Sequence, residues 1–441
     1  MSVELRQLSP FARSFLDRVD GIDSPPAIGP AWLSKLRAAA RDHFAALDLP
    51  HARLEEWRHT PLRDLREENF AANGNAAHSE EAVERSIPSA ADTIELAFVD
   101  GVFRPSERAA PPAGVVVGEL QAALTQDAGL LEADLGRLAS TEKDSFTALN
   151  TAGFAAGCFV HVAAGVRLAR PIHLKFLQTG KTSVLPRVLI LAETASSATV
   201  IEEHGGANAY LNAVVVEIQL HDNADWRHLR IQHESAASRH FNHCAVRLGA
   251  GASFRSDSVV LSGGLVRNRI DVELAGENSS CHLGGLIVAA GEQIVDHHTQ
   301  IRHLVPHTRS VERFRHVLDE RARGVFCGLV HVAVDAQKTD AEQNNRNLLL
   351  SDDAQMNTMP QLEIYADDVR CSHGATLGQL DEDALFYLRA RGIDSDSARS
   401  MLVRAFVEEI IDELPLPALR DWVRATLARR LPGEAPLLEI S

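Results

Sequence analysis

The middle of the chain, from about residue 154 to 380, is a long succession of short stretches in which polar and apolar residues alternate. A period of two is typical of β-strands that bury one face. Gly, Asn, Asp and Ser separate the stretches, and helical periodicity is absent for much of the span. The expected strands are Phe159–Val162, Ile172–Phe176, Arg187–Leu191, Ala198–Glu202, Ala213–Leu220, Trp226–Gln232, Ala245–Leu248, Ser253–Leu261, Arg269–Leu274, Ser280–Val288, Val325–Val330 and Gln361–Tyr365.

So many strands with no helices between them leave three architectures: a sandwich, a barrel or a parallel β-helix. An ordinary sandwich has about 100 residues, so the strand region is too long for one. Its small-residue turns also recur without the wide loops that Greek-key crossovers need. We therefore predict a mainly β chain with a parallel β-helix core at residues 154–380, although the repeat is degenerate and a double sandwich is the alternative.

Helical patterns flank this core on the N-terminal side. Between Pro30 and Pro50, apolar residues recur at close to helical spacing, and we expect a helical region over residues 1–90 in which residues 71–90 form a loose polar connector. Residues 91–153 form a mixed lead-in: Ile94–Val99 alternates and ends at a turn pair, and residues 115–150 return to helical character.

The C-terminal region, residues 381–441, is predicted to be a helical domain with a loose tail. One helix ends at Gly392, a typical residue just past a helix, and Asp394 or Ser395 caps the next; a third runs from residue 418 to about 430. An apolar stripe at helical spacing marks the second of these helices: Ala398, Met401, Leu402, Ala405, Phe406, Ile410 and Leu414. Such a stripe packs either on a partner or on the end of the chain's own β-helix.

The composition excludes several classes of protein. The formal net charge of −16 argues against sequence-independent binding to nucleic acid, which needs a cationic surface. No run of eighteen apolar residues exists, and the N-terminus lacks the apolar core of a secretory signal, so we expect a cytoplasmic protein that does not bind membranes. The five cysteines are scattered, which excludes a CxxC zinc knuckle and indicates reduced thiols.

Cys371 and His373 are the candidate metal ligands. Two residues apart on an extended strand, their side chains point to the same side, and a thiolate with an imidazole supplies half of an iron or zinc site. The alternative is a buried thiol beside a hydrogen-bonded histidine. Polar Asp367–Asp368 before the pair and small Gly374–Ala375 after it favour an exposed surface.

Other polar clusters are assigned structural roles. His297–His298, like His240 with His243, is expected not to bind metal, because twenty histidines in 441 residues make chance clusters common. The amide-rich run 343–347 is typical of side chains that satisfy one another along a sheet. No P-loop is present, so we expect no ATP on this chain, and no GxSxG elbow is found.

Four segments carry a resemblance to a known family. The runs Asp340–Ser351, Pro360–Thr376 and Leu380–Ile393 are similar to the signature of the SufB/SufD family of iron–sulfur cluster assembly scaffold subunits in the SUF system. Glu56–Leu62 (EWRHTPL) resembles the E-W-[RK]-x-T motif near the N-terminus of these proteins. Because the first 150 residues contain no cysteine, the chain resembles the SufD branch rather than the SufB branch.

The resemblance implies a right-handed parallel β-helix between helical ends. It implies a non-catalytic scaffold subunit that pairs with SufB through the β-helices, with a transient iron–sulfur cluster at that interface and His373, beside Cys371, as the ligand from this chain. The C-terminal helices would dock the SufC ATPase, and we assign that docking to Leu402, Phe406, Ile410 and Leu414. Sulfur would enter through SufB from a donor system. A reduced flavin is also associated with such complexes, although no flavin site is evident in the sequence.

Two rival functions remain. An enzyme on a β-helix would be a polysaccharide lyase, which is usually exported, or an acyltransferase, which shows a clear hexapeptide period; neither feature is present here. A purely structural homodimer, paired β-helix to β-helix, is the second rival. Co-purification with an ABC-type ATPase and a second β-helix chain distinguishes the scaffold from the homodimer.

Overall fold

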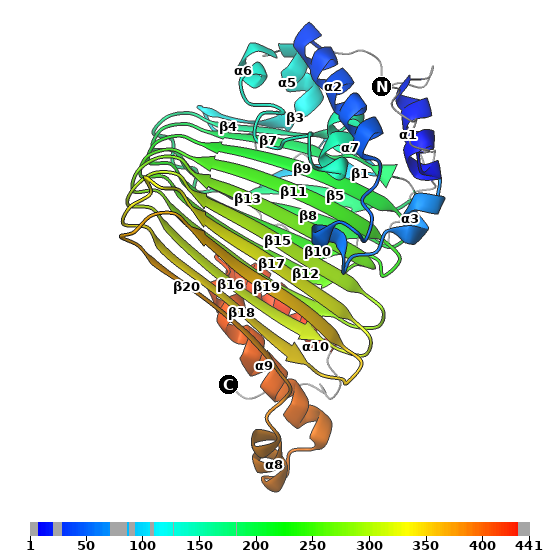
Figure 1. The fold of residues 1–441 in the computed structure, drawn as a ribbon, viewed down its shortest axis with the longest axis vertical. Helices are drawn as coiled ribbons and strands as arrows, with labels where there is room; N and C mark the ends of the chain where they lie inside the picture. The colour runs from blue at the N-terminus through cyan, green and yellow to red at the C-terminus, as the bar shows by residue number, and fades with distance from the viewer. Residues whose placement is uncertain are drawn as a thin grey trace.

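A computed structural model describes residues 8–20, 29–70, 86–87, 93–105, 110–126, 128–181 and 183–430 of the 441. Most of the connector expected at residues 71–90, and the tail expected at the C-terminus, lie outside these residues. The described chain forms two long sheets that face each other, with helices at both ends of the sequence (Figure 1).

The first sheet has the strand order β2-β1-β5-β8-β10-β12-β14-β16-β18-β20, and the second β19-β17-β15-β13-β11-β9-β7-β4-β3, with β6 paired to β9. The strands of the first sheet are β1 (Ile94–Val99), β2 (Val102–Arg104), β5 (Ile172–Gln178), β8 (Ser197–Gly206), β10 (Asp225–His233), β12 (Ser253–Ser262), β14 (Ser280–Ala289), β16 (Arg309–Leu318), β18 (Asp340–Leu349) and β20 (Arg370–Gly378). Those of the second are β3 (Val115–Glu119), β4 (Gly157–Val162), β6 (Ser183–Val184), β7 (Arg187–Ala192), β9 (Leu211–Leu220), β11 (Arg239–Leu248), β13 (Leu265–Leu274), β15 (Ile294–His303), β17 (Arg323–Val332) and β19 (Gln355–Ile364).

From β7 onward the chain alternates between the sheets, and each strand pairs in parallel with the strand one full turn away. Ser253 pairs with Ser280 and Arg309 with Asp340, which gives a repeat of about 30 residues. This is a parallel β-helix of about eight turns, so the predicted fold class is confirmed and the double sandwich is wrong. Strands β3, β6, β15, β16, β18 and β20 were absent from the expected strands, and β3 lies where helical character was expected.

Tight turns connect the sheets at residues with left-handed backbone conformations. Gly251 has φ 65°, and a Cβ there would lie 2.5 Å from Oδ1 of Asn223, which itself has φ 58° in the preceding turn. Glycine and asparagine tolerate this conformation better than other residues. Stacked turns of this kind keep the two sheets in register.

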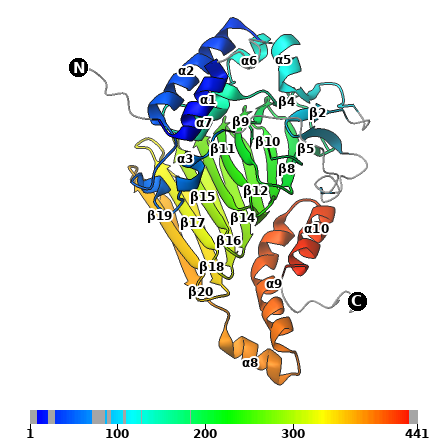
Figure 2. The same ribbon diagram turned by 90° about the vertical axis from the view of Figure 1, so that its right-hand side faces the viewer.

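Helices of the N-terminal part cover the outer face of the second sheet (Figures 1 and 2). They are α1 (Pro10–Asp20), α2 (Ala31–Leu47), the 3₁₀ turn η1 (Glu55–Trp57), α3 (Arg63–Glu67), α5 (Leu120–Gln126), α6 (Ala128–Glu132) and α7 (Ser145–Gly153). The ring of Phe146 in α7 stacks on Phe241 of β11 with centroids 3.6 Å apart. Apolar side chains from this face and from the helices form one buried cluster, which fixes the helices to the β-helix.

The EWRHTPL segment, Glu56–Leu62, contacts the second sheet through buried side chains of β13 and β15. The guanidinium of Arg267 lies 3.9 Å from the centre of the Trp57 ring, a cation–π contact, and Arg267 also donates to the Glu56 carbonyl at 2.8 Å. Thr60 donates a hydrogen bond to the buried carboxylate of Asp296, which is also paired with Arg267. The motif therefore holds the N-terminal helices against β13 and β15.

Three helices follow the last turn of the β-helix: α8 (Glu382–Ala390), α9 (Ser395–Glu413) and α10 (Pro417–Ala428). Helices α9 and α10 lie along the outer face of the first sheet, whereas α8 projects away from the β-helix (Figure 2). Asp381 and Asp394 cap α8 and α9 by accepting backbone N–H groups. Among the described residues, no helix is long and apolar enough to cross a membrane.

Candidate functional site at the open end of the β-helix

The last turn of the β-helix, made by β19 and β20, has no strand of the described residues beyond it. Each is the final strand of its sheet, paired on one side only. Most side chains of β20 are exposed, and Leu377 is 56% exposed although it belongs to the inward-facing row. We call this uncovered last turn the open end. Its free backbone edges and uncovered interior are suited to pairing with another β-structure.

The open end carries both predicted ligands. Cys371 pairs in register with Ala341 and His373 with Gln343, and both partners point into the core. Cys371 packs partly against this core, whereas His373 is exposed. Burial raises the pKa of the Cys371 thiol above its ordinary value, so the thiol keeps its proton until a metal or another electrophile displaces it. The two side chains share a face, as the spacing predicted, at a surface that another molecule can reach.

The turns beneath His373 place a buried acid in the same inward-facing row. Glu312 of β16 pairs in register with Gln343, whose Nε2 donates to Glu312 Oε2 at 2.6 Å. Burial raises the pKa of Glu312 to about 7. This arrangement could not be predicted from the sequence, because finding it requires the repeat of about 30 residues that aligns positions 312, 343 and 373.

Glu312 is expected to make stability depend on pH. Its folded pKa lies above its unfolded value, so the stability that the protonated carboxyl allows is complete below about pH 4.5 and is lost as pH rises through 7. Glu312→Gln should therefore raise the free energy of unfolding at pH 8 by up to about 3 kcal/mol and leave it unchanged at pH 4. Thermal unfolding at both pH values measures this; equal shifts at the two would contradict it.

The predicted apolar stripe of α9 is internal only in part, because Met401 and Ala405 are exposed. Ile410 and Leu414 are 2% and 0% exposed and pack in a cluster with Leu229, Val259 and other outer side chains of the first sheet. Leu402 is half-buried, as is Phe406, which packs against the same cluster. Glu413 and Glu409 add ion pairs to arginines of that sheet. A docking partner cannot reach Ile410 and Leu414 in this arrangement, because the chain's own β-helix covers them.

The remaining histidine clusters are engaged in the fold. His297 points between the sheets, and His298 points outward beside Asp296 at 2.9 Å. His243 contacts Asp271 at 3.0 Å, and His240 lies 2.9 Å from Glu234. Across the residues that the structure describes, no group of three or more His, Cys, Asp or Glu side chains is placed to hold a metal ion. Any iron held by Cys371 and His373 would therefore need ligands beyond the residues that the structure describes.

Comparisons with known proteins agree with this architecture. Residues 176–406 match the family description "SUF system FeS cluster assembly, SufBD core domain", and residues 27–174 match "SufBD protein N-terminal region". The chain belongs to the SufBD family. Its function is thus in iron–sulfur cluster assembly by the SUF system, and the predicted family is confirmed.

Full-length relatives support the assignment. The chain is 31% identical to the iron–sulfur cluster assembly protein SufD of Escherichia coli over 91% of this chain and 95% of that protein. It is 34% identical to an iron–sulfur cluster assembly SufBD family protein of Synechocystis over 89% and 90% of the two chains. Similarity to an E. coli SufD agrees with the predicted SufD branch. The β-helix enzyme is not supported by any of these matches.

Proposed function

We propose that the chain is a non-catalytic scaffold subunit that pairs its open end with a SufB chain and assembles a transient iron–sulfur cluster there. One observation carries the proposal: Cys371 and His373 lie on the inward-facing row of the last turn, whose interior no further strand of the described residues covers. A partner β-helix that adds its strands to the free edges of β19 and β20 would enclose both side chains. The cluster is cargo, and the partner would supply the other ligands.

We also propose that the chain works in the cytoplasm together with SufB, the SufC ATPase and a sulfur donor system. ATP would be hydrolysed by SufC and not by this chain, and sulfur would arrive through SufB from its donor system. A reduced flavin in the complex stays a prediction without assigned residues. A mixed thiolate and imidazole site shared between chains can open when the chains move, which suits a scaffold that must release its cluster.

Co-purification tests the proposal. Expressed with SufB and SufC, the chain should elute in one complex with both, and deletion of β20 with the helices after it should remove SufB from that complex. The free edges would also accept a second copy of this chain, the structural homodimer. Recovery of a homodimer alone, with SufB and SufC present, would overturn the scaffold.

We expect SufC to dock on the exposed side of α8 and α9 rather than on Ile410 and Leu414. Phe386 and Tyr387 of α8 are 74% and 57% exposed, and α8 contacts little besides α9. Large exposed aromatic side chains mark interaction surfaces. Replacing both with Asp should lower SufC recovery at least tenfold in a pull-down, because two buried charges would oppose binding.

Val334→Asp is the control for SufC docking, since Val334 is 65% exposed but lies in a turn of the β-helix. Phe406→Asp with Ile410→Asp should instead lower thermal stability, because these side chains belong to the packing of α9 on the first sheet. Unchanged SufC recovery by the Phe386 and Tyr387 double variant would reject α8 as the docking surface.

A further inference from the structure

Gln343 of β18 lies next to the candidate iron ligand His373 in the inward-facing row. The two residues pair in register on adjacent parallel strands, whose backbones lie about 4.8 Å apart. Their side chains therefore leave the sheet on the same side, toward the interior. Gln343 is 1% exposed, whereas His373 lies in the uncovered last turn. A polar group on Gln343 can therefore influence how the imidazole of His373 is oriented.

One polar atom of the Gln343 amide is used by the fold, and the other is not. Nε2 donates to Oε2 of Glu312, one turn earlier in the same row, at 2.6 Å. Oε1 is buried and has no hydrogen-bond partner among the described residues. Because the carboxylate of Glu312 accepts from the NH₂ group, the amide is held with Oε1 as its free acceptor.

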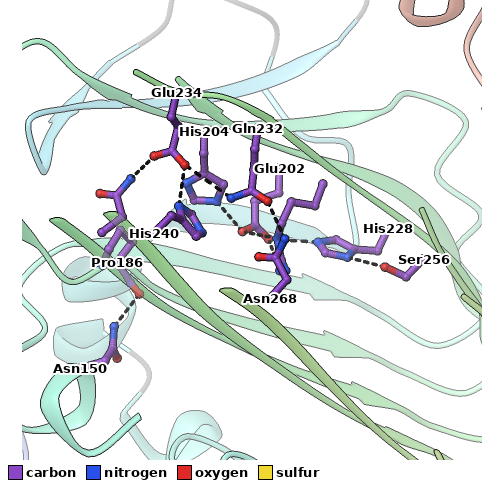
Figure 3. A network of polar contacts seen from close by, with 12 residues as sticks. Asn150, Pro186, Glu202, His204, His228, Gln232, Glu234, His240, Ser256 and Asn268 are labelled. Carbon is purple, nitrogen blue, oxygen red and sulfur yellow. Dashed lines mark hydrogen bonds and ion pairs between the residues drawn. The ribbon is translucent and has the colours of Figure 1, made fainter. Parts of the chain in front are cut away.

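An amide in the middle of the β-helix shows both polar atoms in use (Figure 3). Gln232 donates from Nε2 to Glu234 at 3.4 Å, and its Oε1 accepts from Asn268 Nδ2 at 2.7 Å. Gln343 lacks the second of these contacts. Other buried amide oxygens, such as Oδ1 of Asn268, are also without a partner, but the amide of Gln343 adjoins a candidate iron ligand.

The second sheet leaves room for the Gln343 amide and offers it no donor. A Cβ at Gly328 of β17 would lie 2.2 Å from Gln343 Nε2 and 2.9 Å from its Cδ, so a side chain at this position would displace the amide. The residue in register with Gly328 on β19 is Pro360. Neither residue carries a side-chain donor, so neither can satisfy Gln343 Oε1.

Donors close to the last turn are directed to another oxygen. Asn347 Nδ2 and Thr358 Oγ1 both donate to Asn345 Oδ1, at 2.7 and 3.0 Å. The imidazole of His373, by contrast, carries an N–H group in either of its neutral tautomers. It adjoins Gln343 in register, and it is the donor best placed to satisfy Gln343 Oε1.

We propose that Gln343 is a positioning residue for His373: one imidazole nitrogen donates to Gln343 Oε1, which directs the other nitrogen toward iron at the open end. A neutral imidazole has one N–H group and one lone pair, on different nitrogens. An acceptor at one nitrogen therefore fixes the lone pair on the other. Histidines that bind metals in proteins usually donate their second N–H group to such an acceptor, which orients the ring.

This inference rests on the proposed function and concerns the state in which a partner covers the open end. In the uncovered chain, water can hydrogen-bond to the exposed ring of His373. A partner strand that excludes this water leaves Gln343 Oε1 as the acceptor beside the ring. Glu312 holds the amide from the turn below, so positions 312, 343 and 373 act in sequence along the row.

Gln343→Met is the variant that tests the role, because methionine keeps the length of the side chain and removes the acceptor. Expressed with SufB and SufC, this variant should still enter the complex. Cluster assembly, measured with a cluster-dependent reporter enzyme, should fall about 10–100-fold, as is typical when the partner of a metal-bound histidine is lost. A role in folding alone would lower recovery of the complex together with assembly.

The matched control is Gln361→Met, the same substitution at an exposed position of β19 that points away from the interior. It should leave assembly unchanged. A second variant exchanges the two side chains of the row, Glu312→Gln with Gln343→Glu. The amide at position 312 would then donate to the carboxylate at 343, whose other oxygen can accept from His373. Assembly should return to within about twofold of the unaltered chain.

A crystal structure of the complex with SufB, prepared without iron, measures the hydrogen bond directly. One ring nitrogen of His373 should lie about 2.7–3.2 Å from Gln343 Oε1. A separation above about 3.5 Å would overturn the inference. Normal assembly by Gln343→Met would do the same, as would an exchange variant that forms the complex but assembles no better than Gln343→Met. If Gln343→Met does not fold, the measured distance decides alone.

The outcomes separate this inference from the scaffold proposal. If His373→Ala abolishes assembly and Gln343→Met does not, the scaffold stands and only the role of Gln343 is rejected. If the chain does not pair with SufB, both proposals are rejected.

Discussion

Replacing His373 with alanine is expected to abolish iron–sulfur cluster assembly in cells while the complex with SufB and SufC still forms. The side chain is exposed and no described contact of the fold depends on it, so its removal should change the free energy of unfolding by less than about 0.5 kcal/mol. If His373 is the proposed iron ligand, its loss removes a bond that the other side chains of the site cannot replace. We expect the activity of a cluster-dependent reporter enzyme to fall more than tenfold.

The matched control for His373 is Ser372→Ala, one residue earlier on β20 and also exposed, but pointing to the opposite side of the strand. This variant should support normal assembly. Cys371→Ser should give an intermediate loss if the thiol assists and none if it only packs. Normal assembly by the His373 variant would remove the imidazole from the site, whatever the result for Cys371.

The second large effect concerns stability. Glu217→Gln should lower the free energy of unfolding by about 3–5 kcal/mol, because it leaves the charge of Arg187 buried without a counter-ion. Both side chains of this ion pair are 0% exposed. Arg187 also donates to Thr151 at 2.9 Å, so it cannot turn to solvent without breaking the contact between α7 and β7.

The same carboxylate fixes a loop. Its two oxygens accept backbone N–H groups of Gly136, Leu138 and Ala139 at 2.8–3.1 Å, in the segment that leads from α6 to α7. Chemical denaturation followed by tryptophan fluorescence measures the loss. The control is Glu292→Gln, whose ion pair with Arg321 has partners 78% and 68% exposed and should contribute less than about 1 kcal/mol. Equal effects of the two substitutions would contradict the role of Glu217.

Two of the strands that were missed from the sequence, β15 and β18, share one cause. β18 carries Gln343, Asn345 and Asn347 at inward positions, and β15 carries His297 and Thr299 there. With polar residues on both faces, the apolar–polar alternation that marks a half-buried strand disappears. The strands were found where apolar residues fill the interior, as at Val214, Val216 and Ile218 of β9. A polar interior of this kind is visible only once the turns are stacked.

The C-terminal helices show a different limit. The helical spacing placed Ile410 and Leu414 on a buried face of α9, but that face also includes Val403, Val407 and Ile411, which the predicted stripe did not contain. Periodicity also does not say which surface buries the face. The surface that buries this face is formed by apolar side chains such as Leu229 and Val259 on the outer face of the first sheet, which lie far away in sequence. For Cys371 and His373, the period-two argument gave the shared face. That this face lies in the last turn of the β-helix is known only from the order of the strands in the folded sheets.

The open end also has a consequence for the cell. A chain whose final turn exposes two unpaired strand edges is a template for its own copies, and unpaired edges promote aggregation. If the proposed SufB partner covers these edges, an excess of this chain over that partner should form oligomers or aggregates rather than remain monomeric in solution.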